Sequence, residues 1–68
     1  MKHPKVAKML AKYPQVQWIA LDIARKDVEG NFVLVMGRAS KIDLERDVAW
    51  YRERRPDAKI EYVERLPN

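Results

Sequence analysis

The chain has 68 residues, of which 47% are hydrophobic and 35% are charged, with a formal net charge of +4 and no cysteine. This length allows one small domain of globular composition, and the lack of cysteine excludes disulfides and thiolate metal sites. The sequence contains no apolar run of the length of a signal peptide or a membrane span, so we expect a cytoplasmic protein with no membrane contact.

The first element in the chain, within segment 1–14, is predicted to be a basic amphipathic helix over residues 4–12. Pro4 suits the first turn of a helix, and Pro14 prevents the helix from continuing. Its apolar stripe has helical spacing and consists of Val6, Met9, Leu10 and Tyr13. Its lysines are Lys2, Lys5, Lys8 and Lys12. The whole net charge lies here, because residues 15–68 carry ten basic and ten acidic groups.

Residues 15–37 are predicted to form a β-hairpin, because their hydrophobicity alternates with a period of two on both sides of a polar turn. The first strand places Ile19, Leu21 and Ile23 on one face and Val16, Trp18 and Ala20 on the other. The second strand, 32–37, places Phe32, Leu34 and Met36 on one face, after a turn in which Gly30 and Asn31 can adopt positive φ. Since both faces are apolar, either the two helices cover opposite faces or a second molecule supplies cover. A homodimer is therefore one of two alternatives.

A second helix is predicted over residues 40–55, with Ser40 as its N-cap and a core stripe of Leu44, Val48 and Tyr51, followed by a strand over 58–64. The resulting prediction is a single α+β domain, 1–68, of order α-β-β-α-β. Its three-stranded mixed sheet consists of the hairpin and one further strand, packed with two helices. This order resembles part of a ferredoxin-like sandwich, which is a likeness of fold and implies no function.

The second helix also carries apolar residues outside its core stripe. Trp50 lies about 120° from Leu44 on a helical wheel, beside Ile42 and close to arginines. A large aromatic residue in such a place is typical of a protein interface, although it could also close the rim of a small core. The leading hypothesis is a small binding or adaptor module that acts through protein–protein contact. Its predicted interface residues are Ile42, Arg46, Trp50 and Arg54, with Trp18 as a second candidate surface.

Two alternatives remain at this stage. The lysines at positions 2, 5, 8 and 12 could contact nucleic-acid phosphates without sequence specificity. A further basic cluster at 52–55 could contribute if it shared a surface with them, although cations at a helix C-terminus are also favoured by the helix dipole. The second alternative is a phage- or plasmid-type inhibitor that docks on a host protein.

The residues available for catalysis are few. His3 is the only histidine and lies at the terminus, and Ser40 is the only serine in a chain without threonine. Asp22 follows an apolar strand segment, where a strand-end or sheet-edge position would explain it. We therefore expect no enzymatic activity, no cofactor, no metal site and no small-molecule substrate.

Overall fold

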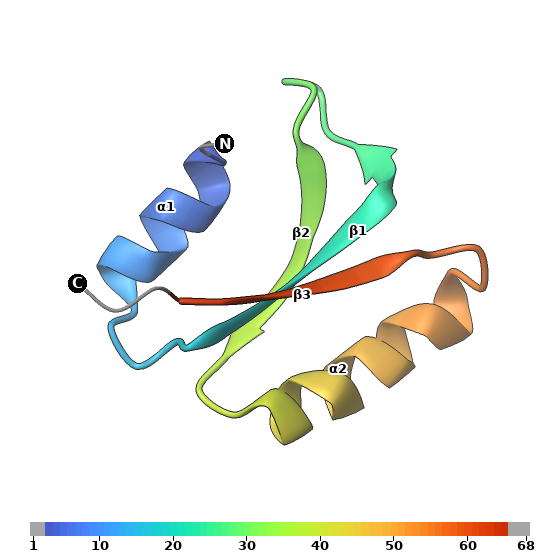
Figure 1. The fold of residues 1–68 in the computed structure, drawn as a ribbon. Helices are drawn as coiled ribbons and strands as arrows, with labels where there is room; N and C mark the ends of the chain where they lie inside the picture. Colours follow the sequence, from blue (N-terminus) through green and yellow to red (C-terminus); the bar gives the residue numbers. More distant parts are fainter. Residues whose placement is uncertain (1–2, 66–68) are drawn as a thin grey trace.

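The protein folds as a three-stranded antiparallel sheet with one helix on each face (Figure 1). The computed structural model describes residues 3–65, and its elements are α1 (Pro4–Lys12), β1 (Trp18–Lys26), β2 (Phe32–Arg38), α2 (Lys41–Arg54) and β3 (Ile60–Glu64). The predicted α+β class and the order α-β-β-α-β are confirmed. Proline stands at the first position of α1, where its missing N–H costs no hydrogen bond.

β1 occupies the centre of the sheet, in the strand order β2-β1-β3, and pairs antiparallel with both neighbours. The sequence predicted a mixed sheet, whereas the sheet is antiparallel throughout. β2 and β3 run in the same direction, but β1 lies between them, so no parallel pair forms. The central position suits β1 because it is buried on both faces, with Ile19, Ala20 and Leu21 all in the core.

The α1 side of the sheet holds one hydrophobic cluster. Its buried members are Val16, Ile19 and Leu21, and the partly buried side chains packed against them are Val6, Met9, Leu10, Phe32 and Leu34. Val16 was predicted on the face of Ala20 but lies here, because it precedes β1 and does not follow the alternation of the strand. Tyr13 was predicted in the apolar stripe but is 42% exposed, because it lies beyond the last residue of α1.

The α2 side of the sheet holds a second cluster. Its buried members are Ala20, Leu44 and Val48, and the partly buried side chains around them are Trp18, Val35, Ile60 and Tyr62. Leu44 and Val48 are the first two residues of the predicted core stripe of α2, and the third, Tyr51, is half-buried. The sequence allowed two ways to cover the apolar sheet: a helix on each face, or a second molecule on one face. The structure shows a helix on each face. The sheet itself therefore needs no second molecule to cover it.

The hairpin departs from simple alternation at two places. The β1–β2 register shifts between Asp22 and Lys26 and also between Ala20 and Leu21, so Met36 pairs with Ala20 while Leu34 pairs with Leu21. Since cross-strand partners share a face, Leu34 and Met36 lie on opposite faces, not on the same face as predicted. At the tip, Gly30 and Asn31 were the residues expected to be able to adopt positive φ, and within the described residues only Gly30 does so, at 83°.

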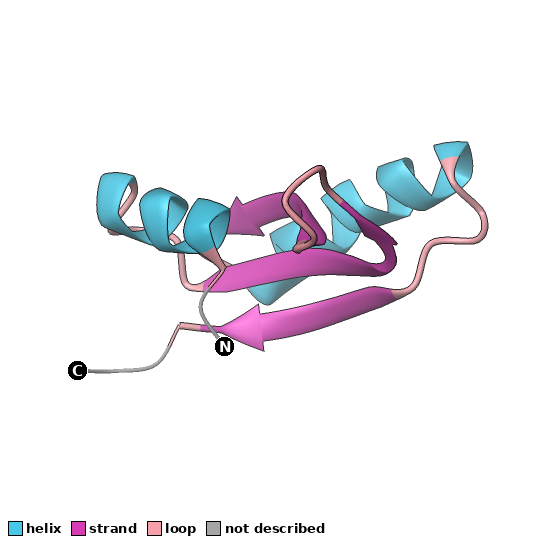
Figure 2. Cartoon of the chain, turned by 90° about the horizontal axis from the view of Figure 1, so that it is seen from above, coloured by secondary structure: helices cyan, strands magenta, loops and turns pink. Residues whose placement is uncertain are grey.

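β3 is covered less than the other two strands. The helix backbones approach β2 and β1 more closely than β3. The view in Figure 2 shows both helices at the level of β1 and β2, while β3, which leads into the C-terminal end, lies beyond them.

Candidate functional site

The outward face of α2 carries an exposed row of residues that does not contribute to either hydrophobic cluster. We call the row Ile42, Arg46, Trp50 and Arg54 the α2 stripe; its members are four residues apart and therefore lie along one side of the helix. Ile42 is 65% exposed and Trp50 is 57% exposed. The structure thus brings together the four α2 residues predicted from the sequence as an interface, with their side chains accessible to solvent.

Trp50 is held in place by a neighbouring cation. The guanidinium carbon of Arg54 lies 3.6 Å from the centroid of the Trp50 ring, a close cation–π contact. Within residues 3–65, neither Arg46 nor Arg54 makes an ion pair, whereas Arg25 and Arg38 both pair with aspartates. The α2 stripe therefore combines apolar surface with guanidinium groups that have no carboxylate partner in the described part of the chain.

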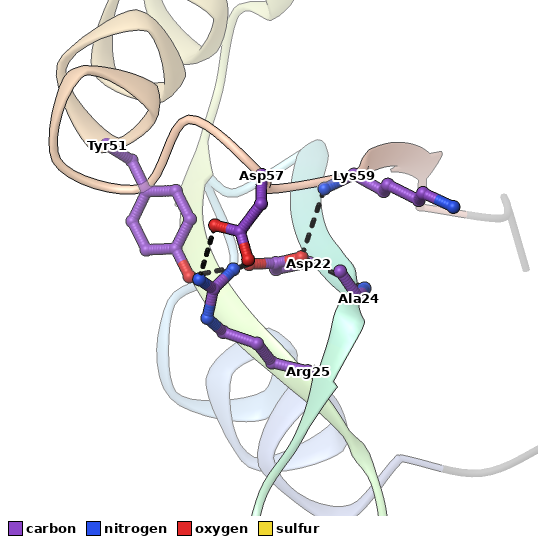
Figure 3. A network of polar contacts seen from close by, with 6 residues as sticks. All are labelled: Asp22, Ala24, Arg25, Tyr51, Asp57 and Lys59. Carbon is purple, nitrogen blue, oxygen red and sulfur yellow. Dashed lines mark hydrogen bonds and ion pairs between the residues drawn. The ribbon is translucent and has the colours of Figure 1, made fainter.

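The orientation of α2 is fixed on its inner side by a buried aspartate (Figure 3). Asp22 lies in β1 with no exposed surface, and its Oδ2 accepts hydrogen bonds from the Tyr51 hydroxyl at 2.8 Å and from Arg25 at 2.7 Å. Arg25 also donates to Asp57 at 2.7 Å, beyond the end of α2. Because consecutive helical residues are about 100° apart, holding Tyr51 against the sheet turns Trp50 toward solvent.

The second oxygen of Asp22 is also fully engaged. Its Oδ1 accepts the main-chain N–H groups of Ala24 at 3.0 Å and of Lys59 at 3.2 Å. Burial by itself raises the pKa of this carboxyl, but the hydrogen bonds from Tyr51, Arg25 and the two amides outweigh burial and hold the pKa below its usual value. Tyr51 shows the opposite direction, since burial and the bond to Asp22 raise its pKa. With both oxygens occupied, Asp22 serves as a link between β1, α2 and the start of β3.

Asp22 thus differs from the sequence interpretation, which placed it at a strand end or a sheet edge. It lies within the central strand, paired with Val33 on one side and Ile60 on the other. The partners of Asp22 could not be predicted locally, because Tyr51 and Lys59 are 29 and 37 residues further along the chain. A carboxylate within a stretch, 18–24, whose other residues are all apolar is the signal that could have indicated a buried, paired group.

Trp18 does not extend the α2 stripe. It lies in β1 and packs against the cluster formed by Ala20, Leu44 and Val48. The ammonium group of Lys41, at the start of α2, lies 5.1 Å from the centroid of its ring. The side chain predicted as a second interface candidate is therefore half-buried and is covered in part by a cation of its own chain.

The lysine side of α1 is only partly available to a ligand. Lys5, Lys8 and Lys12 are exposed, but Lys5 forms an ion pair with Asp27 at 3.4 Å. The Lys12 ammonium lies 5.5 Å from the Tyr13 ring centroid. Lys2 lies outside the described residues. The basic cluster at 52–55 belongs to α2, which packs on the opposite side of the sheet from α1, so the two basic regions do not form one continuous surface (Figure 1).

Both ends of α1 are held by polar groups that the sequence did not identify. His3 was interpreted as a residue of a fraying terminus, but it is buried and acts as the N-cap. Its Nδ1 accepts the N–H of Val6 at 3.4 Å, and its Nε2 lies 2.5 Å from the carbonyl oxygen of Phe32. At the other end, Arg65 donates to the carbonyl oxygens of Leu10, Tyr13 and Val16. The position of His3 directly before Pro4 was the available signal for a cap.

The described residues contain no group of three or more His, Cys, Asp or Glu side chains arranged to hold a metal ion. Two shallow depressions, of about 350 and 210 Å³, lie beside α1, and no member of the α2 stripe lines them. No helix within residues 3–65 is long and apolar enough to cross a membrane.

In comparisons with known proteins, the chain matches no family model, no curated protein and no solved structure. The site must therefore be interpreted from its own geometry.

Proposed function

We propose that the protein is a small, non-catalytic binding module that acts through protein–protein contact at the α2 stripe. The observation that carries this proposal is Trp50, which is 57% exposed and lies under the Arg54 guanidinium on a helix whose other side is already packed. Tryptophan and arginine are the residue types most enriched among side chains that dominate binding energy at protein interfaces.

The shape and charge of the α2 stripe also indicate the kind of partner. A helix face is convex, so its complement is a groove or a flat surface on another protein and not a small molecule. Arg46 and Arg54 have no ion-pair partner within residues 3–65. We therefore expect the partner to present carboxylates around an apolar area that receives Ile42 and Trp50.

The nucleic-acid alternative receives less support. One of the three described lysines of α1 is paired with Asp27, and the arginines at the end of α2 lie on the other side of the sheet. A phosphate-binding surface would therefore depend on few free cations. The phage- or plasmid-type inhibitor remains a special case of protein binding through the same stripe.

The proposal is tested by comparing proteins captured on immobilised wild-type chain, on Trp50→Ala and on a Lys8→Ala/Lys12→Ala double variant. We expect Trp50→Ala to weaken capture of a specific protein by roughly thirtyfold or more, while the lysine variant retains it. Capture that survives Trp50→Ala but is lost with the lysine variant would contradict the proposal. A salt titration of a labelled oligonucleotide with the wild-type protein then decides whether α1 binds phosphates.

A further inference from the structure

β3 is an edge strand, and no other strand of residues 3–65 pairs with its outer side. β3 pairs with β1 without any register shift, from Trp18 opposite Glu64 to Asp22 opposite Ile60. In the other edge strand, β2, the register shift between Ala20 and Leu21 leaves Val35 without a partner in β1, and such a bulge disfavours pairing with a further strand. β3 is therefore the regular edge of the sheet, and the helices extend little over it.

The main-chain groups that β3 presents outward follow from its ladder with β1. Arg65 N–H donates to the Gln17 carbonyl and Ile23 N–H donates to the Lys59 carbonyl, at the two ends of the ladder. In an antiparallel pair, alternate residues bond to the partner strand, so the odd-numbered residues of β3 bond to β1. The N–H and C=O groups of Ile60, Tyr62 and Glu64 therefore point away from β1, toward the free edge.

These outward groups are complementary to those of an identical strand. A two-fold axis through Tyr62 pairs Tyr62 with Tyr62 of the second copy and Ile60 with Glu64 in both directions. Every outward N–H and C=O of the three residues then has a partner, which gives six hydrogen bonds by the alternation rule. An axis through Glu61 instead would place two carboxylates directly opposite each other, which destabilises a strand pair.

We propose that β3 pairs antiparallel with β3 of a second copy of this chain, so that two three-stranded sheets join into one of six strands. On the α1 side, this register places Val63 of each copy opposite Glu61 of the other copy. Val63 is 39% exposed and lines the 210 Å³ depression beside α1 together with Glu61. The contact surface is separate from the α2 stripe, so the pairing leaves Trp50 accessible and does not depend on the proposed function.

The test uses two substitutions of the same exposed valine that introduce opposite charges. Val63→Glu places a carboxylate opposite Glu61 of the second copy, whereas Val63→Lys places an ammonium group there. Sedimentation across a concentration series should show the wild type passing from 8.1 kDa to twice that mass. We expect Val63→Glu to raise the dimer dissociation constant roughly tenfold or more, and Val63→Lys to leave it unchanged or lower it.

A charge exchange checks the register. The double variant Glu61→Lys/Val63→Glu restores opposite charges across the axis and should recover dimerisation lost in Val63→Glu. A dimer that is unaffected by Val63→Glu, or that is lost equally in both single variants, would overturn the proposed register. A wild-type mass of one chain throughout the concentration series would overturn the proposal itself.

Hydrogen exchange on the wild-type protein tests the same edge without any substitution. The amides of Tyr62 and Glu64 should exchange rapidly in dilute protein and become protected as the concentration rises. The amides of Glu61 and Val63, which face β1, should be protected at both concentrations. Trp50→Ala should leave the mass unchanged, and a dimer that dissociates in that variant would instead place self-association at the α2 stripe.

Discussion

The two helices, α1 of 9 residues and α2 of 14, use their apolar residues in different ways. α1 separates its apolar and charged residues cleanly, yet no residue of α1 itself is fully buried. α2 carries apolar residues on two sides, buries Leu44 and Val48 completely on one of them, and leaves Ile42 and Trp50 exposed on the other. The single apolar side of α1 is used to pack against the sheet. α2 has a second apolar side, which is left accessible for another contact.

The helices also differ in what fixes them to the sheet. α1 is held at its ends, by His3 and by Arg65, mainly through main-chain partners. α2 is held near its C-terminal end through Tyr51, which donates to the buried carboxylate of Asp22. Loss of the Asp22 contacts should therefore affect the whole fold, while loss of a cap should affect α1 alone.

The largest expected effect is that of Asp22→Ala. The substitution leaves the Tyr51 hydroxyl and two amides without their acceptor, and it removes one of the two carboxylates that pair with Arg25. Removal of one partner from a buried, charged network costs about 3–5 kcal/mol, which is most of the stability of a domain of this size. Urea denaturation followed by circular dichroism should show a non-cooperative or largely unfolded chain at 25 °C. A cooperative transition close to that of the wild type would show that the network does not hold the fold together.

The next largest effect is expected for Arg65→Ala, which removes hydrogen bonds from a guanidinium to three carbonyl oxygens at the end of α1. Hydrogen bonds of charged groups contribute about 1.5–3 kcal/mol, and we expect a loss of that order in the free energy of unfolding. Arg65→Lys is the matched control, because it keeps the charge but cannot reach three acceptors in a fork. Equal stability of both variants and the wild type would contradict the role of Arg65 in holding α1.

The Asp22 carboxyl also predicts how stability depends on pH. Because its pKa is lower in the folded protein than its usual value, the unfolded chain binds the proton more readily. The stabilisation of the fold by the Asp22 carboxylate is therefore fully present above a pH of about 4, the ordinary pKa of an aspartate, and is lost as the pH falls below it. Denaturation between pH 7 and pH 2 should show this loss, and Tyr51→Phe should reduce it by removing one of the bonds that lower the pKa. The same slope in both proteins would argue against Asp22 as its source.

A smaller effect is expected at the start of α1. His3→Ala removes the side chain that accepts the Val6 N–H, and the loss of an N-cap costs about 1 kcal/mol. His3→Asn supplies another good capping residue and should recover part of this loss, although not the contact with Phe32. Thermal denaturation of the two variants measures the difference, and a more stable His3→Ala variant would contradict the cap.

Local signals in the sequence predicted the helices well and the long-range polar contacts poorly. Pro4 and Pro14 delimit α1, and the spacing of Leu44 and Val48 identifies the buried side of α2, because each signal acts within a few residues. The position of β3 beside β1 depends on pairing between distant segments, so a mixed sheet was an equally good prediction. The burial of Asp22 depends on partners in α2 and before β3, which no local pattern contains.

The candidate site divides in the same way. The α2 stripe follows from helical periodicity alone, and the exposure of Ile42 and Trp50 agrees with that reasoning. Trp18 is half-buried because α2 packs over its face of the sheet. The alternation of residues in β1 does not predict which helix covers that face.

The central claim, that α2 packs against the sheet through one side and leaves Trp50 outside the core, is tested most directly by unfolding Trp50→Ala and Tyr51→Phe side by side. These neighbouring residues point about 100° apart around the helix, and both substitutions can be measured by the same urea denaturation. We predict a loss of about 1–2 kcal/mol for Tyr51→Phe, since it leaves the buried Asp22 oxygen short of one donor. Trp50→Ala should change the stability by no more than about 0.5 kcal/mol. A large loss in Trp50→Ala with little change in Tyr51→Phe would place the tryptophan in the core and contradict the account.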